Sequence, residues 1–143
     1  MREIKFRAWD VEEQYMYECV SVATTRENKW ITMIVNKLGY ITSIEGPYEL
    51  MQYTGLKVNG DIELYEGDIV PVKSSVYFGW KQGREHFKAN AVVVYDEKEM
   101  RYRFLAYTKD FGKQYVDFDK SIRQSYKIIG NIYENPELLE ETK

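Results

Sequence analysis

The chain has 143 residues, of which 44% are apolar, and a formal net charge of −3. This length predicts one domain, or one domain with a small appendage, whose core needs no metal or disulfide. The net negative charge argues against general electrostatic binding of nucleic acid, although a local basic patch is compatible with that net charge. Cys19 is the only cysteine, which excludes an internal disulfide and fits a reducing cytoplasm. No run approaches the roughly 18 apolar residues of a membrane helix, so we expect neither a leader segment nor membrane insertion.

Composition and spacing predict a mainly β fold. The 13 tyrosines and six phenylalanines favour pleated, half-buried surfaces. In the amino-terminal part, short apolar runs alternate with polar residues and are separated by charged or glycine-containing turns. We expect strands there over residues 4–8, 15–22, 30–35 and 40–44. Glu45-Gly46-Pro47 then breaks the chain, and residues 1–50 are predicted to form a first, strand-rich subdomain.

The stretch from Leu50 to Val70 contains the clearest hairpin signal. Asn59-Gly60 lies between two apolar segments, and this dipeptide readily takes positive φ at both central positions of a two-residue turn. The second segment is interrupted at Glu66-Gly67-Asp68, where Gly67 supplies backbone angles that a branched residue does not. We therefore expect a hairpin at Asn59-Gly60 and a bulge or tight bend at Gly67.

Residues 51–143 are predicted to form the second subdomain. Strand-like runs cover residues 91–95, 101–107, 115–118 and 128–133, with a helical turn around residues 121–124. Several short strands with regular turn signals indicate a sandwich or a small barrel. The polar and aromatic segment 74–90 is predicted to be a long loop. Near the end, Asn135 followed by Pro136 is typical of a helix start, so we expect a short C-terminal helix.

Several segments in a fixed order resemble the YopX family, small proteins encoded by phages and prophages of Gram-positive bacteria. They are Met1–Asp10, Met51–Lys57, Asn59-Gly60, Tyr65–Val70 and Ile129–Leu139. Together these segments span the whole chain. The resemblance implies an amino-terminal αβ portion followed by a small SH3-like β-barrel, α+β overall. It implies no reaction and no cofactor.

A few single residues invite a chemical interpretation. His86 has no Cys, His or Asp around it at metal-ligand spacing, and we expect it to face solvent. Cys19 lies in a predicted strand, where a lone cysteine behaves as a small hydrophobe, although a Cys19–His86 pair remains an alternative. Glu66 and Asp68 form either an acidic pair for a cation or for acid–base chemistry, or a solvated bend in which Asp68 caps backbone N–H groups. We favour the bend, and predict no catalytic, metal or cofactor site.

The predicted loop carries the side chains that best suggest a binding surface. They are Tyr77, Phe78, Trp80, Lys81, Arg84, Phe87 and Lys88, with Lys73 just before the loop. Rings beside cations are typical of proteins that bind single-stranded nucleic acid. Aromatic residues and arginine are also enriched in protein interfaces. A third interpretation is that the loop buries its rings against its own barrel.

These observations predict a cytoplasmic binding module rather than an enzyme, and the resemblance implies that a phage or prophage encodes it. Protein–protein interaction or assembly is the preferred function, because tyrosine-rich β surfaces suit partner recognition. A nucleic-acid accessory role that uses residues 73–90 is the alternative. Exposed strand edges and aromatic patches also predict a homo-oligomer. No nucleophile, base and orienting group can be assembled from these residues, which argues against catalysis.

Overall fold

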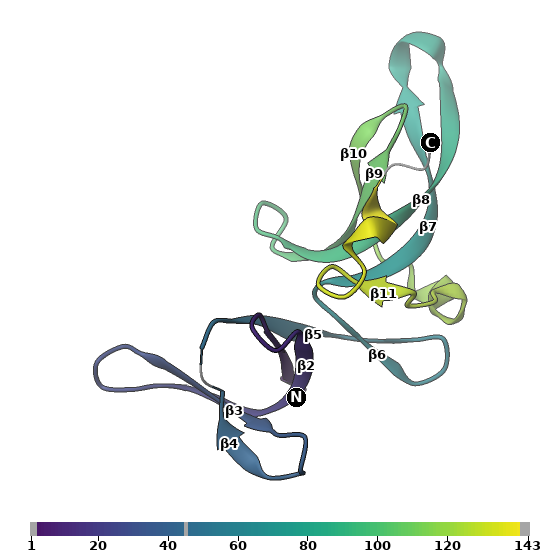
Figure 1. Cartoon of the computed structure of the whole chain (residues 1–143). Coiled ribbons are helices and arrows are strands. Elements are labelled where there is room, and N and C mark those ends of the chain that lie inside the picture. Colours follow the sequence, from purple (N-terminus) through teal and green to yellow (C-terminus); the bar gives the residue numbers. More distant parts are fainter. Residues whose placement is uncertain (1–2, 45, 141–143) are drawn as a thin grey trace. The chain divides into compact units, whose positions relative to one another are not determined.

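The computed structural model describes residues 3–44 and 46–140. Its contacts divide the chain into two compact units, Met1–Gly55 (unit 1) and Leu56–Lys143 (unit 2). Both units are built from antiparallel strands (Figure 1). Helical structure in the described residues is limited to three short 3₁₀ segments, and none of it is long and apolar enough to span a membrane. The chain is therefore mainly β, as its composition predicted.

Unit 1 is an antiparallel sheet with the strand order β4-β3-β2-β1-β5. Its strands are β1 (Phe6–Asp10), β2 (Tyr15–Thr24), β3 (Trp30–Val35), β4 (Ile41–Ser43) and β5 (Tyr48–Val58), of which β5 continues into unit 2. The four strands predicted before residue 45 are confirmed, with shifted ends. Met51 and Gln52, assigned from the sequence to the second subdomain, pair with Arg7 and Phe6 of β1.

The core of unit 1 is small, and its first turn is made by a buried aspartate. Ala8, Tyr17 and Ile34 form the buried cluster. The Asp10 carboxylate accepts hydrogen bonds from the Glu12 and Glu13 N–H groups, both at 2.9 Å. This local bonding reverses the chain between β1 and β2. Residues 3–44 and 46–55 contain no helix, so the αβ portion that the resemblance implies is not found there.

A hairpin is found at Asn59-Gly60, as predicted, but three residues, 59–61, separate its strands instead of the predicted two. It joins the end of β5 to β6 (Ile62–Tyr65), and φ is 43° at Asn59 and 91° at Gly60. The predicted bend at Gly67 is also confirmed, with φ of 85°. It forms a tight turn into β7 (Asp68–Phe78), where the Tyr65 N–H donates to Asp68 Oδ2 at 2.8 Å.

Unit 2 contains a five-stranded antiparallel sheet with the order β10-β9-β8-β7-β11. The strands after β7 are β8 (Gly83–Asp96), β9 (Arg101–Thr108), β10 (Gly112–Val116) and β11 (Gly130–Asn131). One core cluster fills this unit, and it consists of Val58, Leu64, Val70, Val72, Ala91, Val93, Phe104, Ala106 and Tyr126. The two end strands, β10 and β11, are not neighbours in the described sheet, so the sheet does not close into a barrel.

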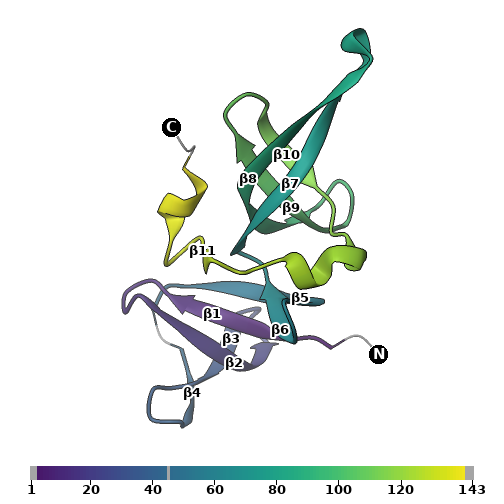
Figure 2. The ribbon, with the colours of Figure 1, turned by 90° about the vertical axis from the view of Figure 1, so that its right-hand side faces the viewer.

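The prediction of a long loop over residues 74–90 is wrong. β7 and β8 pair in register from Ile69↔Val92 to Phe78↔Gly83, and η1 (Gly79–Lys81) connects them. In Figures 1 and 2 this two-stranded ribbon extends beyond β10. The sequence hides these strands because Ser74 interrupts the apolar series Val72, Val76 and Phe78, and because serine is frequent in turns. The long pairing to a second strand compensates for this weak local signal.

The carboxyl-terminal segment is helical where predicted, but its type differs. η2 (Lys120–Ser125) covers the expected helical turn, and η3 (Pro136–Leu139) replaces the expected C-terminal helix. Asn135 does not cap η3 with its side chain; its Oδ1 accepts from the Asn131 N–H at 3.4 Å. The strand predicted over 128–133 shortens to β11, because Asn131 Oδ1 accepts from the next N–H groups and turns the chain.

Candidate functional site

The β7–β8 ribbon is the part of unit 2 that carries every residue of the predicted binding surface. We call residues 72–90 the β7–β8 arm. β9 pairs with β8 only at Ala91–Asp96, and β11 pairs with β7 only at Asp68 and Ile69. Within the described residues, neither outer edge of the arm is therefore paired with another strand. Unpaired edges of this kind are open to contact with other chains.

Cross-strand register places the phenylalanine rings of the arm on the face opposite Lys73, Arg84 and Lys88. Residues directly opposite each other in a ladder share a face, and successive residues alternate between faces. One face, the ring face, consists of the pairs Ser74↔Phe87, Val76↔Glu85 and Phe78↔Gly83. The other, the open face, consists of Lys73↔Lys88, Ser75↔His86 and Tyr77↔Arg84. The phenylalanines and the cations that are interleaved in the sequence thus lie on opposite faces of the arm.

The ring face is packed against its own unit. Phe111, in the turn between β9 and β10, lies 5.7 Å from the Phe78 ring centroid and 6.2 Å from that of Phe87. Phe87 also packs on the core cluster of unit 2. Trp80, in η1, contacts Phe78 edge-on at 6.0 Å and remains 78% exposed. For Phe78 and Phe87 the interpretation as structural packing is therefore confirmed, whereas Trp80 stands at the end of the arm.

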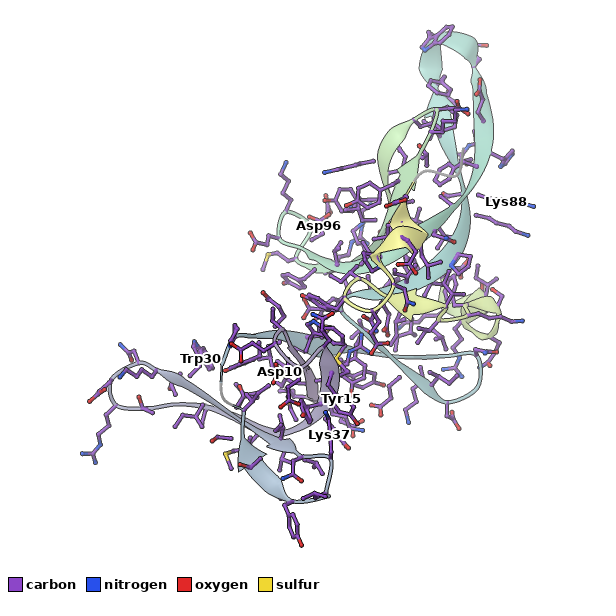
Figure 3. All side chains as sticks on the ribbon, in the orientation of Figure 1. Asp10, Tyr15, Trp30, Lys37, Lys88 and Asp96 are labelled. Atoms are coloured by element: carbon purple, nitrogen blue, oxygen red, sulfur yellow. The ribbon has the colours of Figure 1, made fainter. Side chains whose placement is uncertain are left out.

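The open face is polar and accessible. Tyr77 is 61% exposed, and the Arg84 guanidinium lies 6.0 Å from its ring centroid. Arg84 Nη1 also donates to Ser75 Oγ at 3.5 Å. A hollow of about 400 Å³ is lined by Lys73, Ser74, Ser75, His86, Phe87 and Lys88. Figure 3 shows the Lys88 side chain directed away from the ribbon. The Lys81 side chain, named in the predicted surface, lies outside the described residues.

Charge is distributed unevenly between the arm and the rest of the chain. Residues 72–90 carry four basic side chains (Lys73, Lys81, Arg84 and Lys88) against Glu85 alone, a net charge of +3. The whole chain carries −3, so the remaining residues carry −6. The arm is consequently a basic element on an acidic protein. An anionic ligand would be attracted to the arm and repelled elsewhere.

The other residues with candidate chemistry, His86, Cys19 and Asp68, each have a local structural setting. His86 is not in a loop but in β8, directly opposite Ser75. Burial raises the pKa of the Cys19 thiol to about 11, which suits a structural cysteine. Asp68 caps the Tyr65 N–H, as the bend interpretation predicted, but the aspartate is buried and not solvated. No cluster of three or more His, Cys, Asp or Glu side chains in the described parts of the chain is arranged to hold a metal ion.

A second hollow lies beside the arm, at the edge of β8. It has a volume of about 300 Å³ and is lined by Glu85–Asn90, by Tyr107–Phe111 and by Leu138–Glu140. The Asn90 side-chain amide donates to the Leu138 carbonyl at 2.8 Å. This lining carries two lysines (Lys88 and Lys109) and three carboxylates (Glu85, Asp110 and Glu140), a net charge of −1, so it does not attract an anion.

The arrangement of the residues predicted as a binding surface was not evident from the sequence. Phe111, which packs against both Phe78 and Phe87, was not among the predicted residues. The sequence signal for these strands was the spacing of their apolar residues: Val76 and Phe78 are two residues apart, as on one face of a strand, and Phe87 lies on the second strand. If residues 72–90 are read as two paired strands, Phe78 and Phe87 fall on one face and the cations Lys73, Arg84 and Lys88 on the other.

Nearly the whole chain matches a known family. The family model described as "YopX protein" matches residues 5–140. The chain belongs to the YopX family. A solved structure is similar to this YopX chain, the crystal structure of protein EF1440 from Enterococcus faecalis, with a TM-score of 0.60 and 29% sequence identity. That similarity covers 98% of this chain and 100% of the other. No curated protein sequence matches the chain.

Proposed function

We propose that this YopX protein is a phage- or prophage-encoded binding module of the host cytoplasm that holds a protein partner and catalyses no reaction. The observation that carries the proposal is the exposed end of the β7–β8 arm. Trp80 and Tyr77 are exposed there by 78% and 61%, and Arg84 lies against Tyr77. Tryptophan, tyrosine and arginine are the residue types that dominate binding energy in protein interfaces.

The rigidity of the arm also supports this function. Phe78 and Phe87 are held against Phe111, so the end of the arm is supported rather than free to collapse. A surface that is already ordered loses less conformational entropy when a partner binds. The unpaired outer edges of the arm add main-chain hydrogen-bonding groups that an extended partner segment can use.

The finer architecture of unit 2 belongs to the same proposal. We infer that unit 2 corresponds to the SH3-like barrel that the resemblance implies, in an open form. Five antiparallel strands around one core cluster support this correspondence. The arm then extends two central strands of the barrel, β7 and β8, beyond the core.

Trp80→Ala tests the function. Because Trp80 is exposed, we expect the melting temperature to stay within the error of the wild type. Capture of a partner from host lysate treated with nuclease should fall, with a loss on the order of 2 kcal/mol in binding free energy. Trp30→Ala is the matched control, since Trp30 is 68% exposed on unit 1 (Figure 3). Equal capture by wild type and Trp80→Ala would contradict the proposal.

A second candidate, a nucleic-acid accessory role, is favoured by one specific observation. Lys73, Arg84 and Lys88 lie on the same face of the arm, away from the packed phenylalanine rings. Tyr77 and Arg84 are common to this face and to the end of the arm, whereas Lys73 and Lys88 belong only to this face and Trp80 only to the tip, so these last three residues distinguish the two functions.

A further inference from the structure

The open face of the β7–β8 arm has the charge, the chemistry and the dimensions of a duplex DNA contact. We propose that this face lies along the major groove of duplex DNA, where it contacts phosphates and base edges. The inference rests on the second candidate function above, and it requires no protein partner at Trp80. It assigns the ligand class and the residues that contact it.

The first observation is a pair of lysines directly across the ladder. Lys73 and Lys88 are register partners on the open face, and both are exposed. Like charges directly opposite each other destabilise an antiparallel pair. An anion between the two ammonium groups removes that repulsion, and the hollow of about 400 Å³ over this part of the arm leaves room for one. The Lys73–Lys88 pair is therefore more favourable with a phosphate bound between its ammonium groups than in the isolated protein.

The second observation is the chemistry of the next two pairs. Ser75↔His86 and Tyr77↔Arg84 continue the open face toward the end of the arm. Every one of these side chains has a hydrogen-bonding group, and none is purely aliphatic. Serine, tyrosine, lysine and arginine are among the side chains that contact DNA phosphates and sugars, while arginine and lysine also read guanine in the major groove.

The third observation is size. Residues on one face of a strand repeat about every 6.7 Å, so the three open-face pairs cover roughly 13 Å along the arm. Across the groove the relevant dimension is the width of the ribbon, whose two strands lie about 4.8 Å apart, and the major groove of B-DNA, about 12 Å wide, admits a two-stranded β-ribbon. With neither outer edge of residues 72–90 paired to another strand in the described structure, the ribbon can enter a groove with its open face toward the bases.

The same observations weigh against other anionic or protein partners. Single-stranded nucleic acid binds where several rings stand beside cations; the open face offers Tyr77 beside Arg84, but Phe78 and Phe87 lie on the opposite face, packed near Phe111. Duplex RNA has a deep, narrow major groove that side chains do not reach. Lysine is depleted in protein interfaces. A second copy of the arm, paired through this face, would bring more like charges together.

The test is the binding of wild type and Lys88→Glu to a short labelled DNA duplex, measured by fluorescence anisotropy over a salt series. Three phosphate contacts, from Lys73, Arg84 and Lys88, predict a slope of log K against log salt of about −2.7. Lys88→Glu should weaken binding at least tenfold and reduce the slope by about one contact or more. It places a carboxylate opposite Lys73, so its melting temperature should be equal to or above that of the wild type.

Two controls make the outcome decisive. Lys57→Glu changes the net charge of unit 2 by the same amount on an exposed residue outside the arm, and it should leave duplex binding within twofold of the wild type. Trp80→Ala should leave duplex binding unchanged, and Lys88→Glu should leave capture of a protein partner unchanged. Failure of this inference is therefore distinguishable from failure of the protein-binding proposal.

Four results would overturn the assignment. They are no binding of duplex DNA at low salt, an equal loss with Lys57→Glu, stronger binding to single-stranded DNA or duplex RNA than to duplex DNA, and a loss with Trp80→Ala as large as that with Lys88→Glu. Lys73→Glu provides a second variant of the same pair, and we expect it to reproduce the effect of Lys88→Glu.

Discussion

Asn59 and Gly60 show how single residues determine the entry to unit 2. Both have positive φ, the conformation that glycine adopts freely and asparagine tolerates. The Gly60 N–H donates to the Gln124 side-chain oxygen at 2.6 Å, which ties the turn to η2. An added Cβ at Gly60 would meet nothing within 4 Å. The glycine is therefore required by its backbone angle and not by a lack of space.

Gly60→Val should destabilise the protein by about 1–3 kcal/mol, because a β-branched residue is strained at φ of 91°. Urea denaturation measures the change in the free energy of unfolding. Gly79→Ala is the control, since the Cβ added at Gly79 lies 3.8 Å from its nearest neighbour, a Tyr77 ring carbon, and Gly79 lacks a positive φ. Equal stability of Gly60→Val and wild type would show that the turn tolerates a branched residue.

At the scale of elements, one arginine connects three strands at the end of the sheet in unit 2. Arg103, in β9, donates to Asp96 Oδ2 in β8 at 2.9 Å and to Asp117 Oδ1, just after β10, at 2.8 Å. Its guanidinium also lies 4.8 Å from the Tyr115 ring centroid. Asp96 additionally accepts from the Lys98 and Glu99 N–H groups and so forms the β8–β9 turn. These hydrogen bonds to Asp96 require its carboxylate in the charged form.

We expect this arrangement to make the protein sensitive to acid. The Arg103 side-chain hydrogen bond, assisted by backbone N–H groups, holds the pKa of Asp96 below its ordinary value of 3.8. A group with a depressed folded-state pKa stabilises the fold fully above its unfolded pKa, and that contribution is lost as the pH falls through the folded value. Unfolding free energy, measured by urea titration, should therefore decrease as the pH falls below 3.8.

Asp96→Asn should remove part of that pH dependence and lower the stability at neutral pH. Asp61→Asn, which changes an exposed carboxylate in the turn after Gly60, is the matched control and should keep the wild-type pH profile. If Asp96→Asn and wild type lose stability in parallel between neutral and acidic pH, the carboxylate of Asp96 does not contribute in this way.

At the scale of the whole molecule, apolar side chains remain exposed on unit 1. Trp30, Tyr40 and Ile41 are 68%, 68% and 60% exposed, and Ile41 belongs to β4, a three-residue strand at the edge of its sheet. Exposed edges and apolar patches are surfaces by which β proteins associate. This feature is separate from the arm, which lies in unit 2.

We expect the protein to form a homo-oligomer through this surface. Light scattering at high micromolar concentration should give a multiple of the 17.1 kDa chain mass. Ile41→Lys should shift the mass toward the monomer, because a buried, unpaired ammonium group at an apolar contact is unfavourable. Ile122→Lys, at an exposed residue of η2, is the control. A wild-type mass of 17.1 kDa would exclude self-association under these conditions.

The amino-acid sequence by itself determined the features that depend on neighbouring residues. The positive-φ turns at Asn59-Gly60 and Gly67 were predictable because only a few residue types tolerate those backbone angles. The strands of unit 1 were predictable from the alternation of apolar and polar side chains, which has the period of a half-buried strand. The ordered blocks also identified the family.

Only the tertiary structure decided how the arm is built. The pairs Lys73↔Lys88 and Ser74↔Phe87 join residues far apart in sequence, and their register is not encoded in either strand alone. Local preference at Ser74 and Ser75 favours a turn or loop, but hydrogen bonding along the β7–β8 ladder outweighs it. Because neighbouring residues on a strand face opposite ways, that register is what separates packed rings from exposed cations.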